Sequence, residues 1–231
     1  LIYECDVRGP AELAWYVAND DGWLFDAFLF LHQRTISGRA TMNGATDQAD
    51  WEGQLDTWFA PGRDLHALDE AIEAATQQHG PVPPRRVMFS IPYPHPQVTA
   101  FGDVDGDGAS EDLSTVEGRT KVAQWYIAEA RRRFAAAGFR HLELWGLYWM
   151  NEGASDADIA VVRQFSDAVH AADKRMLWIP WFMAPGWERW REMGIDVAIM
   201  QPNYAFLTVH GGKIRRNRLV VNARAARREG L

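Results

Sequence analysis

The sequence predicts an α/β fold of the (β/α)8 TIM-barrel type, cut short after about six βα units. Short apolar segments alternate with amphipathic helical patterns along the chain, which is typical of βαβ units and a parallel sheet. The apolar segments are nearly continuous rather than alternating, as expected of parallel strands covered on both faces. The length of 231 residues is close to the roughly 250 residues of a full barrel. We therefore expect residues 1–231 to form a single catalytic barrel domain that is incomplete at both ends.

Six segments rich in β-branched or aromatic residues are expected to be the strands, because each is too short for a helix. They are Leu1–Tyr3, Leu24–Leu31, Val87–Tyr93, Leu142–Met150, Met176–Met183 and Ile195–Gln201. The first begins at Leu1 rather than methionine and has the pattern of the end of a strand, so we expect an N-terminal stretch to be missing.

Helices are expected between the strands. Leu65–His79 and Lys121–Ala137 place apolar residues at helical spacing, and each is followed by a glycine, the common residue after a helix end. The other expected helices are Asp156–Ala172, the short Trp187–Met193 and the basic Ile214–Glu229. We expect the last to be a solvated basic helix; an anion-docking patch is the alternative.

Two long segments interrupt the alternation of strands and helices. Gln33–Asp64 is polar and contains no convincing strand, so it predicts a long loop. Phe101–Gly118 is acidic and rich in glycine. Both follow a strand at its carboxyl end, where barrels keep their functional loops.

Composition excludes several classes of function. The net charge of −7 argues against nucleic-acid binding, which depends on neutralising phosphates. Nothing approaches about 18 consecutive apolar residues, so no membrane span is expected. The one cysteine excludes an internal disulfide and a cysteine zinc site. The usual metalloprotease, nucleotide-binding and serine-hydrolase motifs are also absent from the sequence.

The end of the fourth expected strand carries the leading catalytic candidate. Asn151 and Glu152 follow this strand directly, beside Trp145, Tyr148 and Trp149. Aromatic surroundings would remove water from the Glu152 carboxyl and raise its pKa, as a general acid at neutral pH requires. The alternative is that Asn151 and Glu152 only begin a loop and cap the next helix.

Glycoside hydrolysis generally needs a second carboxyl group, about 5 Å away for retention of configuration and about 6.5–9.5 Å for inversion. Asp26 and Asp196 are poorly placed within or near strands, and Asp6 and Asp103 are weak candidates. The natural position is the end of a seventh strand, which would lie beyond Leu231.

Aromatic and amide side chains follow several strands and predict a sugar-binding surface at one barrel mouth. Flat rings stack on the apolar faces of sugars, and amides bond to hydroxyl groups. The expected binding residues are Tyr93, His95, Tyr148, Trp149, Asn151, Trp181, Trp187, Gln201, Asn203 and Tyr204. The alternative is that the rings fill the core; we expect this of about half of the eleven tryptophans, including Trp178.

The segment 101–108 resembles the start of a calcium loop. Asp103, Asp105 and Asp107 are spaced as positions 1, 3 and 5 of an EF-hand, with glycine at position 6. Position 12 is Ser114 instead of glutamate, although Glu111 or Asp112 could substitute. We expect either a structural calcium ion or a solvated acidic turn, and no cofactor required for the chemistry.

These motifs resemble those of a bacterial family, the domain of unknown function 4855 family. The resemblance rests on Tyr-Trp-Met-Asn-Glu at 148–152, Trp-Ile-Pro-Trp-Phe at 178–182, Ala-Ile-Met-Gln-Pro-Asn-Tyr at 198–204, and the segment 101–108. It implies a glycoside-hydrolase-like TIM barrel. Asn151-Glu152 is also distantly similar to the acid/base position of retaining clan-A glycoside hydrolases, whose nucleophile follows strand seven.

The sequence therefore predicts a glycoside hydrolase acting on a poly- or oligosaccharide, with Glu152 as general acid/base. A noncatalytic carbohydrate-binding barrel is the alternative. A calcium-dependent polysaccharide lyase ranks third, because only His95 and His32 could supply its basic residue. A secreted or periplasmic location is favoured, although no signal peptide can be read or excluded.

Overall fold

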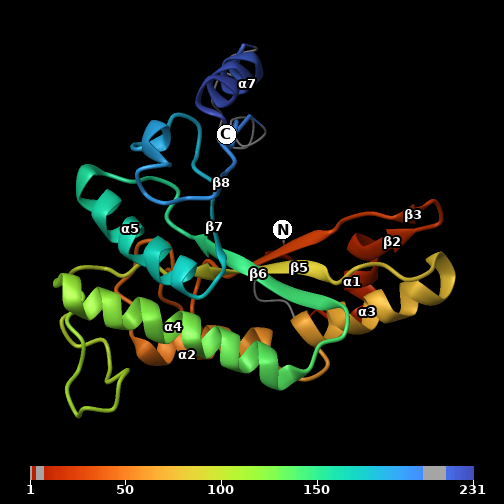
Figure 1. Ribbon diagram of the computed structural model, residues 1–231, viewed down its shortest axis with the longest axis horizontal. Helices are drawn as coiled ribbons and strands as arrows, with labels where there is room; N and C mark the ends of the chain where they lie inside the picture. Colours follow the sequence, from red (N-terminus) through yellow and green to blue (C-terminus); the bar gives the residue numbers. More distant parts are fainter. Residues whose placement is uncertain (1, 4–7, 205–216) are drawn as a thin grey trace.

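The chain is a mixed α/β protein built on one parallel sheet (Figure 1). The computed structural model describes residues 2–3, 8–204 and 217–231. The strands lie in the order β1-β4-β5-β6-β7-β8, and every neighbouring pair is parallel. Their bounds are β1 Ile2–Tyr3, β4 Ala27–Leu31, β5 Arg85–Ile91, β6 Leu142–Trp149, β7 Arg175–Trp178 and β8 Val197–Ala198. All six expected strands are therefore confirmed, with shorter bounds for most.

Two local features shape the middle of the sheet. The register between β5 and β6 shifts after Val87, because β6 accommodates Trp145 as an extra residue. One position later, Gly146 lies so close to β7 that a Cβ atom there would be 2.3 Å from the carbonyl oxygen of Arg175. Glycine is thus required where β6 and β7 approach each other. β7 ends at Trp178, two residues before Pro180, which has no N–H to donate.

The main expected helices are present. They are α3 (Asp64–His79), α4 (Val116–Ala137), α5 (Asp156–Ala171) and α7 (Arg218–Glu229). Thr115 caps α4 by accepting from the Gly118 N–H, and Ser155 with Asp158 forms a capping box on α5. Gly138 ends α4 in the left-handed conformation, at φ 62°. The first residues of the expected basic helix lie outside the described residues.

The predicted loop 33–64 is wrong in part, because it contains the helix α2 (Gln48–Trp58). The helix looked polar because two of its five buried residues are Asp50 and Gln54. Asp50 accepts a hydrogen bond from Ser37, and Gln54 donates to the Ser90 carbonyl. Burial of bonded polar groups therefore hid the helical pattern.

Four further elements differ from expectation. The sequence analysis did not predict α1 (Pro10–Val17) or the hairpin of β2 (Ala18–Asn19) and β3 (Gly22–Trp23). The expected helix 187–193 is only a 3-10 turn, η1 (Trp187–Arg189). Gly186 before it and Gly194 after it both have positive φ, which limits a regular helix to the residues between them.

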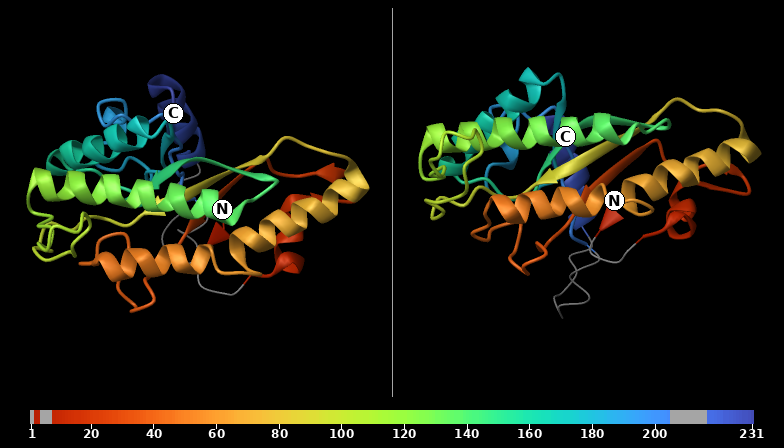
Figure 2. Two further views of the ribbon diagram at one scale, coloured as in Figure 1. Left: turned by 60° about the horizontal axis from the view of Figure 1, so that its bottom comes forward. Right: turned by 90° about the horizontal axis from the view of Figure 1, so that it is seen from below.

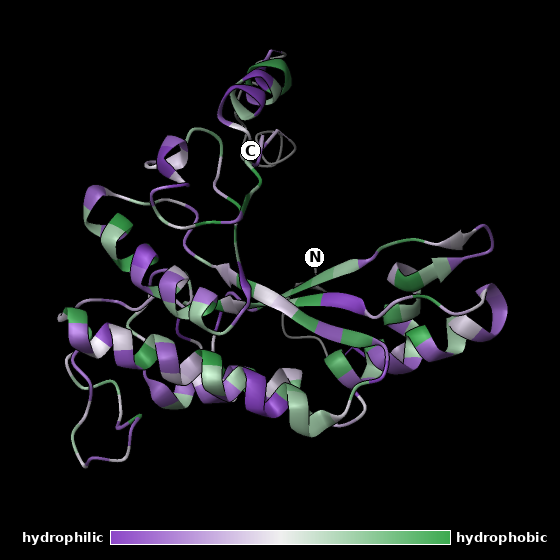
Figure 3. Cartoon of the chain, viewed as in Figure 1, coloured by the Kyte–Doolittle hydropathy of each residue, from purple (hydrophilic) through white to green (hydrophobic). Residues whose placement is uncertain are grey.

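The two faces of the sheet differ. Every helical residue of the core belongs to one large apolar cluster, which includes Trp51, Phe89, Trp149 and Trp178. A smaller cluster on the other face contains Leu31, Tyr148 and no helical residue. Figures 1 and 2 show α2, α3, α4 and α5 lying along the sheet, and Figure 3 shows both hydrophobic and hydrophilic residues on each of them. The described helices therefore cover one face of the sheet.

Closure of the sheet into a barrel stays a prediction. β1 and β8 are the edges of the sheet, and no pairing joins them among the residues that the structure describes. No helix in these ranges is both long and apolar enough to cross a bilayer.

Candidate functional site

The carboxyl ends of β6, β7 and β8 converge around Glu152. The main chain after each strand is joined to the next: the Trp181 N–H donates to the Glu152 carbonyl at 3.3 Å, and the Gln201 N–H donates to the Pro180 carbonyl at 2.8 Å. These bonds continue the sheet beyond its regular strands. They bring together three segments, around Glu152, Trp181 and Gln201, that span about 50 positions of the sequence.

Glu152 is a partly buried carboxyl with one amide partner. The Gln201 side chain donates from Nε2 to Glu152 Oε1 at 2.7 Å. Burial raises the pKa of Glu152, and the Gln201 hydrogen bond offsets part of this rise because it favours the charged form. No second carboxyl group of the described residues is among the causes of this shift. A carboxyl in this state is suited to hold a proton to higher pH than a solvated one.

Tyr148 lies close to Glu152 on the face of the sheet without helices. It is buried, and both burial and the charge of Glu152 raise the pKa of its phenol. The phenol is therefore neutral near pH 7. Of the three rings expected around Glu152, Tyr148 is the one that the structure couples to it.

The side-chain amide of Asn151 forms a hydrogen bond within its own loop. Its Oδ1 accepts from the Gly153 N–H at 3.2 Å, and its main-chain carbonyl accepts from the Trp178 indole at 2.8 Å. Trp178 is fully buried, as expected. This buried ring fixes the backbone immediately before Glu152.

Gln201 and Asn203 bind protein groups in this structure. Besides Glu152, Gln201 Nε2 donates to the Ile179 carbonyl at 2.9 Å. Asn203 Oδ1 accepts from the Phe182 N–H at 2.8 Å, and its Nδ2 lies 3.5 Å from Gln201 Oε1. Both amides were expected to bind sugar hydroxyl groups, but here Gln201 uses three and Asn203 two of their four hydrogen-bonding positions for protein groups.

The backbone is strained at two residues of the loops that carry these contacts. Met183 and Asn203 have φ of 57° and 45°, in the left-handed region that residues other than glycine rarely adopt. Such strain persists only where the surroundings impose it, and it is concentrated at functional sites. Met183 and Asn203 place such backbone in the loops after β7 and β8; Asp64 and Asp173 have similar φ elsewhere in the described residues.

Some of the aromatic residues expected on the sugar-binding surface are exposed, and others lie in the core. Trp181 is 41% exposed and lies beside Glu152, with its Nε1 3.6 Å from the position of a Cβ on Gly153. Tyr204 is partly exposed. Of the eleven tryptophans, six are buried, in line with the expectation that about half fill the core.

Trp149 and Trp187 are core residues here, which corrects their expected place on an open surface. They are 1% and 5% exposed and belong to the cluster under the helices. Trp149 packs edge-on against Phe165 of α5 and against Tyr93. Alternation along a strand explains the result, because Trp149 and its neighbour Tyr148 must point to opposite faces.

Tyr93 and His95 form a separate group at the end of β5. The Tyr93 hydroxyl donates to Asp158 Oδ1 at 2.6 Å, and burial with this hydrogen bond raises the pKa of the phenol. His95 packs edge-on against Tyr93, and its Nδ1 accepts from the Gln97 N–H. The structure gives neither residue a contact with Glu152.

None of the described aspartates that the sequence offered as a second carboxyl lies beside Glu152. Asp196 accepts from His170 and from the Met176 N–H at the amino end of β7. Asp26 precedes β4, also at the amino end of the sheet. Asp6 falls outside the described residues, and Asp103 belongs to the acidic loop.

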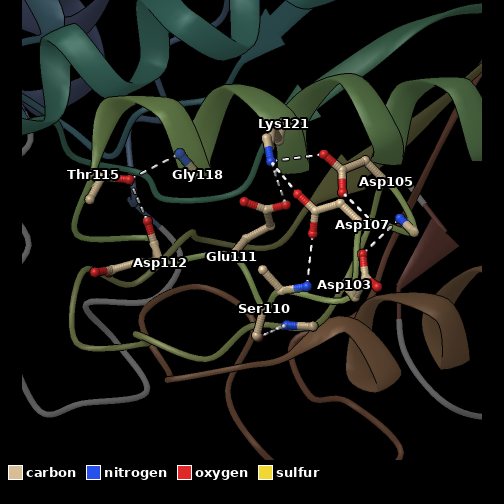
Figure 4. Close-up of polar contacts among 12 residues, drawn as sticks. Asp103, Asp105, Asp107, Ser110, Glu111, Asp112, Thr115, Gly118 and Lys121 are labelled. Atoms are coloured by element: carbon tan, nitrogen blue, oxygen red, sulfur yellow. Dashed lines mark hydrogen bonds and ion pairs between the residues drawn. The ribbon is translucent and has the colours of Figure 1, made fainter.

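The acidic loop, residues 101–115, extends from the amino end of α4 (Figures 1 and 4). Carboxylate oxygens of the exposed Asp103, Asp105 and Asp107 lie within 4.8 Å of one another. Lys121 of α4 supplies a positive charge: its Nζ lies 2.8 Å from Asp105, 3.6 Å from Asp107 and 3.3 Å from the buried Glu111. Nothing in the sequence pattern indicated this lysine.

This arrangement bears on the expected calcium ion. Both oxygens of Asp103 accept backbone N–H groups, from Gly106 and Gly108. Glu111 joins the cluster, whereas Asp112 accepts from the Ser114 N–H instead. A calcium ion would have to share the remaining oxygens with Lys121 or displace it.

The fold and site define a mixed α/β protein with a parallel sheet, helices on one face, and a partly buried glutamate at the carboxyl ends of three strands. Residues 13–228 match the family described as Domain of unknown function (DUF4855), and the chain belongs to this family. No curated protein and no solved structure matches the chain.

Proposed function

We propose that this chain is part of a (β/α) barrel that hydrolyses glycosidic bonds, with Glu152 as the general acid/base. The observation that carries the proposal is the state of Glu152, a partly buried carboxyl with a raised pKa at the end of β6. General acids that work near neutral pH need this kind of environment.

The architecture supports the barrel part of the proposal. The strand order follows the chain without reversal, so successive crossovers of the same hand place their helices on the same face. Doubly wound sheets reverse the order and cover both faces. The carboxyl ends of barrel strands are also where barrel enzymes keep their catalytic groups.

In the proposed reaction Glu152 donates its proton to the oxygen of the departing sugar. Trp181, exposed beside Glu152, would stack on a sugar ring and hold the bond to be cleaved near the carboxyl. Tyr148, buried and neutral, adds no charge that would compete for the proton. The partner carboxylate of the reaction is left unassigned by the described residues.

That missing partner favours a second candidate, a noncatalytic carbohydrate-binding protein. The exposed ring of Trp181 would serve a binder as well as an enzyme. Glu152 would then accept a sugar hydroxyl instead of donating a proton. The two candidates differ in turnover, which only the enzyme would show.

A calcium-dependent lyase has less support. Of its two candidate bases, His32 is buried and accepts the indole N–H of Trp58 at 3.2 Å. Burial, with the nearby charge of Arg63, lowers the pKa of His32 to about 4, so it is a weak base. His95 remains, without a contact to Glu152.

The test is hydrolysis of a panel of neutral and amino-sugar glycans by the full chain, followed as release of reducing ends. We expect Glu152→Gln to lower the rate by at least about 100-fold, the usual contribution of a general acid. Glu143→Gln is the matched control, because Glu143 lies exposed on the same strand and pairs with Arg86 at 3.6 Å.

An unchanged rate in Glu152→Gln would remove the catalytic assignment. Glycan binding without turnover, weakened by Trp181→Ala, would identify the binding protein instead.

A further inference from the structure

A chain of hydrogen bonds leads from Phe182 through Asn203 and Gln201 to Glu152, and at each step the donor is on the Phe182 side. At one end, the Phe182 main-chain N–H can only donate, so the atom of Asn203 that receives it at 2.8 Å is the oxygen. At the other end, the Ile179 carbonyl can only accept, so the atom of Gln201 that faces it at 2.9 Å is the amide nitrogen. Two backbone groups therefore fix the orientation of both side-chain amides.

The fixed orientation has a consequence for Glu152. Asn203 turns its NH2 group toward Gln201 Oε1, at 3.5 Å, and Gln201 turns its NH2 group toward Glu152 Oε1, at 2.7 Å. Glu152 Oε1 therefore accepts from an amide donor. In a protonated carboxyl the oxygen without the proton is the stronger acceptor, so this hydrogen bond favours the proton on Oε2.

We propose that Gln201 and Asn203 are positioning residues that reserve Oε1 of Glu152 as an acceptor and leave Oε2 to carry the transferable proton. The proposal rests on the proposed function. In the transfer, the Oε2–H bond breaks, its electron pair stays on the carboxylate, and the proton bonds to the departing oxygen. The Gln201 hydrogen bond strengthens as Glu152 becomes charged, so it favours the transfer.

The backbone supports this role for Asn203. Its φ of 45° is unusual for a residue other than glycine, although asparagine tolerates it better than most. This conformation lets one side chain reach both the Phe182 N–H and Gln201. Phe182 is itself held from α7, where the Arg218 guanidinium lies 4.3 Å from the centre of its ring.

The experiment measures the pKa of Glu152 directly and needs no substrate. The full chain is labelled with ¹³C at glutamate side chains, and the Glu152 signal is assigned by its loss in Glu152→Gln. Gln201→Met removes the donor at similar volume, and we expect it to raise the pKa of Glu152 by about 1. Asn203→Gly keeps the left-handed backbone, and we expect a smaller rise.

Asn222→Ala is the matched control. Asn222 also donates its amide to a carbonyl of the β8 segment, that of Met200 at 3.1 Å, but has no contact with Glu152. This variant should leave the pKa of Glu152 unchanged. Circular dichroism checks the fold of each variant, and Asn203→Gly provides the test if Gln201→Met does not fold.

The outcomes separate this proposal from the proposed function. A pKa of Glu152 that stays the same or falls in folded Gln201→Met overturns the positioning role, even if the protein hydrolyses glycans. The expected rise, together with glycan hydrolysis that Glu152→Gln leaves unchanged, supports the hydrogen-bond arrangement and refutes Glu152 as the general acid/base. If hydrolysis is found, the alkaline limb of kcat/KM should move to higher pH in Gln201→Met, because the acid stays protonated longer.

Discussion

Trp178 links the stability of the sheet to the position of Glu152. Its ring is fully buried on β7, and its indole N–H donates to the Asn151 carbonyl at 2.8 Å. Trp178→Phe removes this hydrogen bond, at about 1 kcal/mol, and leaves a small gap in the core, at about 1–2 kcal/mol. We expect the free energy of unfolding to fall by about 2–3 kcal/mol, measured by urea denaturation.

A control lies three residues further along the chain. Trp181 is 41% exposed, so Trp181→Phe should change the free energy of unfolding by less than about 0.5 kcal/mol. If Trp178→Phe lowers the free energy of unfolding by less than about 0.5 kcal/mol, no more than the control does, the claim that this ring stabilises the segment before Glu152 is refuted.

Three further predictions concern proton binding, close packing and calcium. Burial raises the pKa of Glu152 in the folded protein. Glu152 therefore keeps its proton in the folded state at pH values where the unfolded chain has released it. Its contribution to the free energy of unfolding falls as pH rises above about 4. Glu152→Gln should remove this loss: urea denaturation should find it more stable than wild type at pH 8 and equal to it at pH 3, and equal stability at both would be evidence against the shift. Gly146→Ala should lower the melting temperature by several degrees, since its Cβ would meet the Arg175 carbonyl oxygen at 2.3 Å; an unchanged value would mean that β6 and β7 can separate. In equilibrium dialysis with radioactive calcium, Lys121→Met should bind calcium more tightly than wild type, because the competing ammonium is gone, and no bound calcium in either protein would exclude calcium from the acidic loop.

Much of the fold followed from local patterns. Strands such as Leu142–Trp149 are nearly continuous apolar runs, and helices such as Asp156–Ala171 carry apolar residues at helical spacing with caps at their ends. These signals depend on neighbours in sequence, so they can be read without the tertiary structure. α2 escaped prediction because its buried face includes Asp50 and Gln54, whose partners lie elsewhere in the chain.

The site was predictable in its parts but not in its arrangement. Glu152 and Gln201 were both singled out from strand ends, yet nothing in the sequence says that one donates to the other. Trp149 was expected at the barrel mouth but lies in the core under the helices, because a continuously apolar strand gives no sign of which residues face the helices.

The sequence by itself determines the order of strands and helices, because hydrophobic spacing, caps and glycines act over a few residues. Two long-range contacts had to come from the folded chain: the amide network that ends on Glu152, and the ion pairs of Lys121 with the acidic loop. Each joins side chains whose meeting depends on how strands and helices pack. Hydrogen bonds and charges act at a few ångströms, and only the packed structure sets those distances.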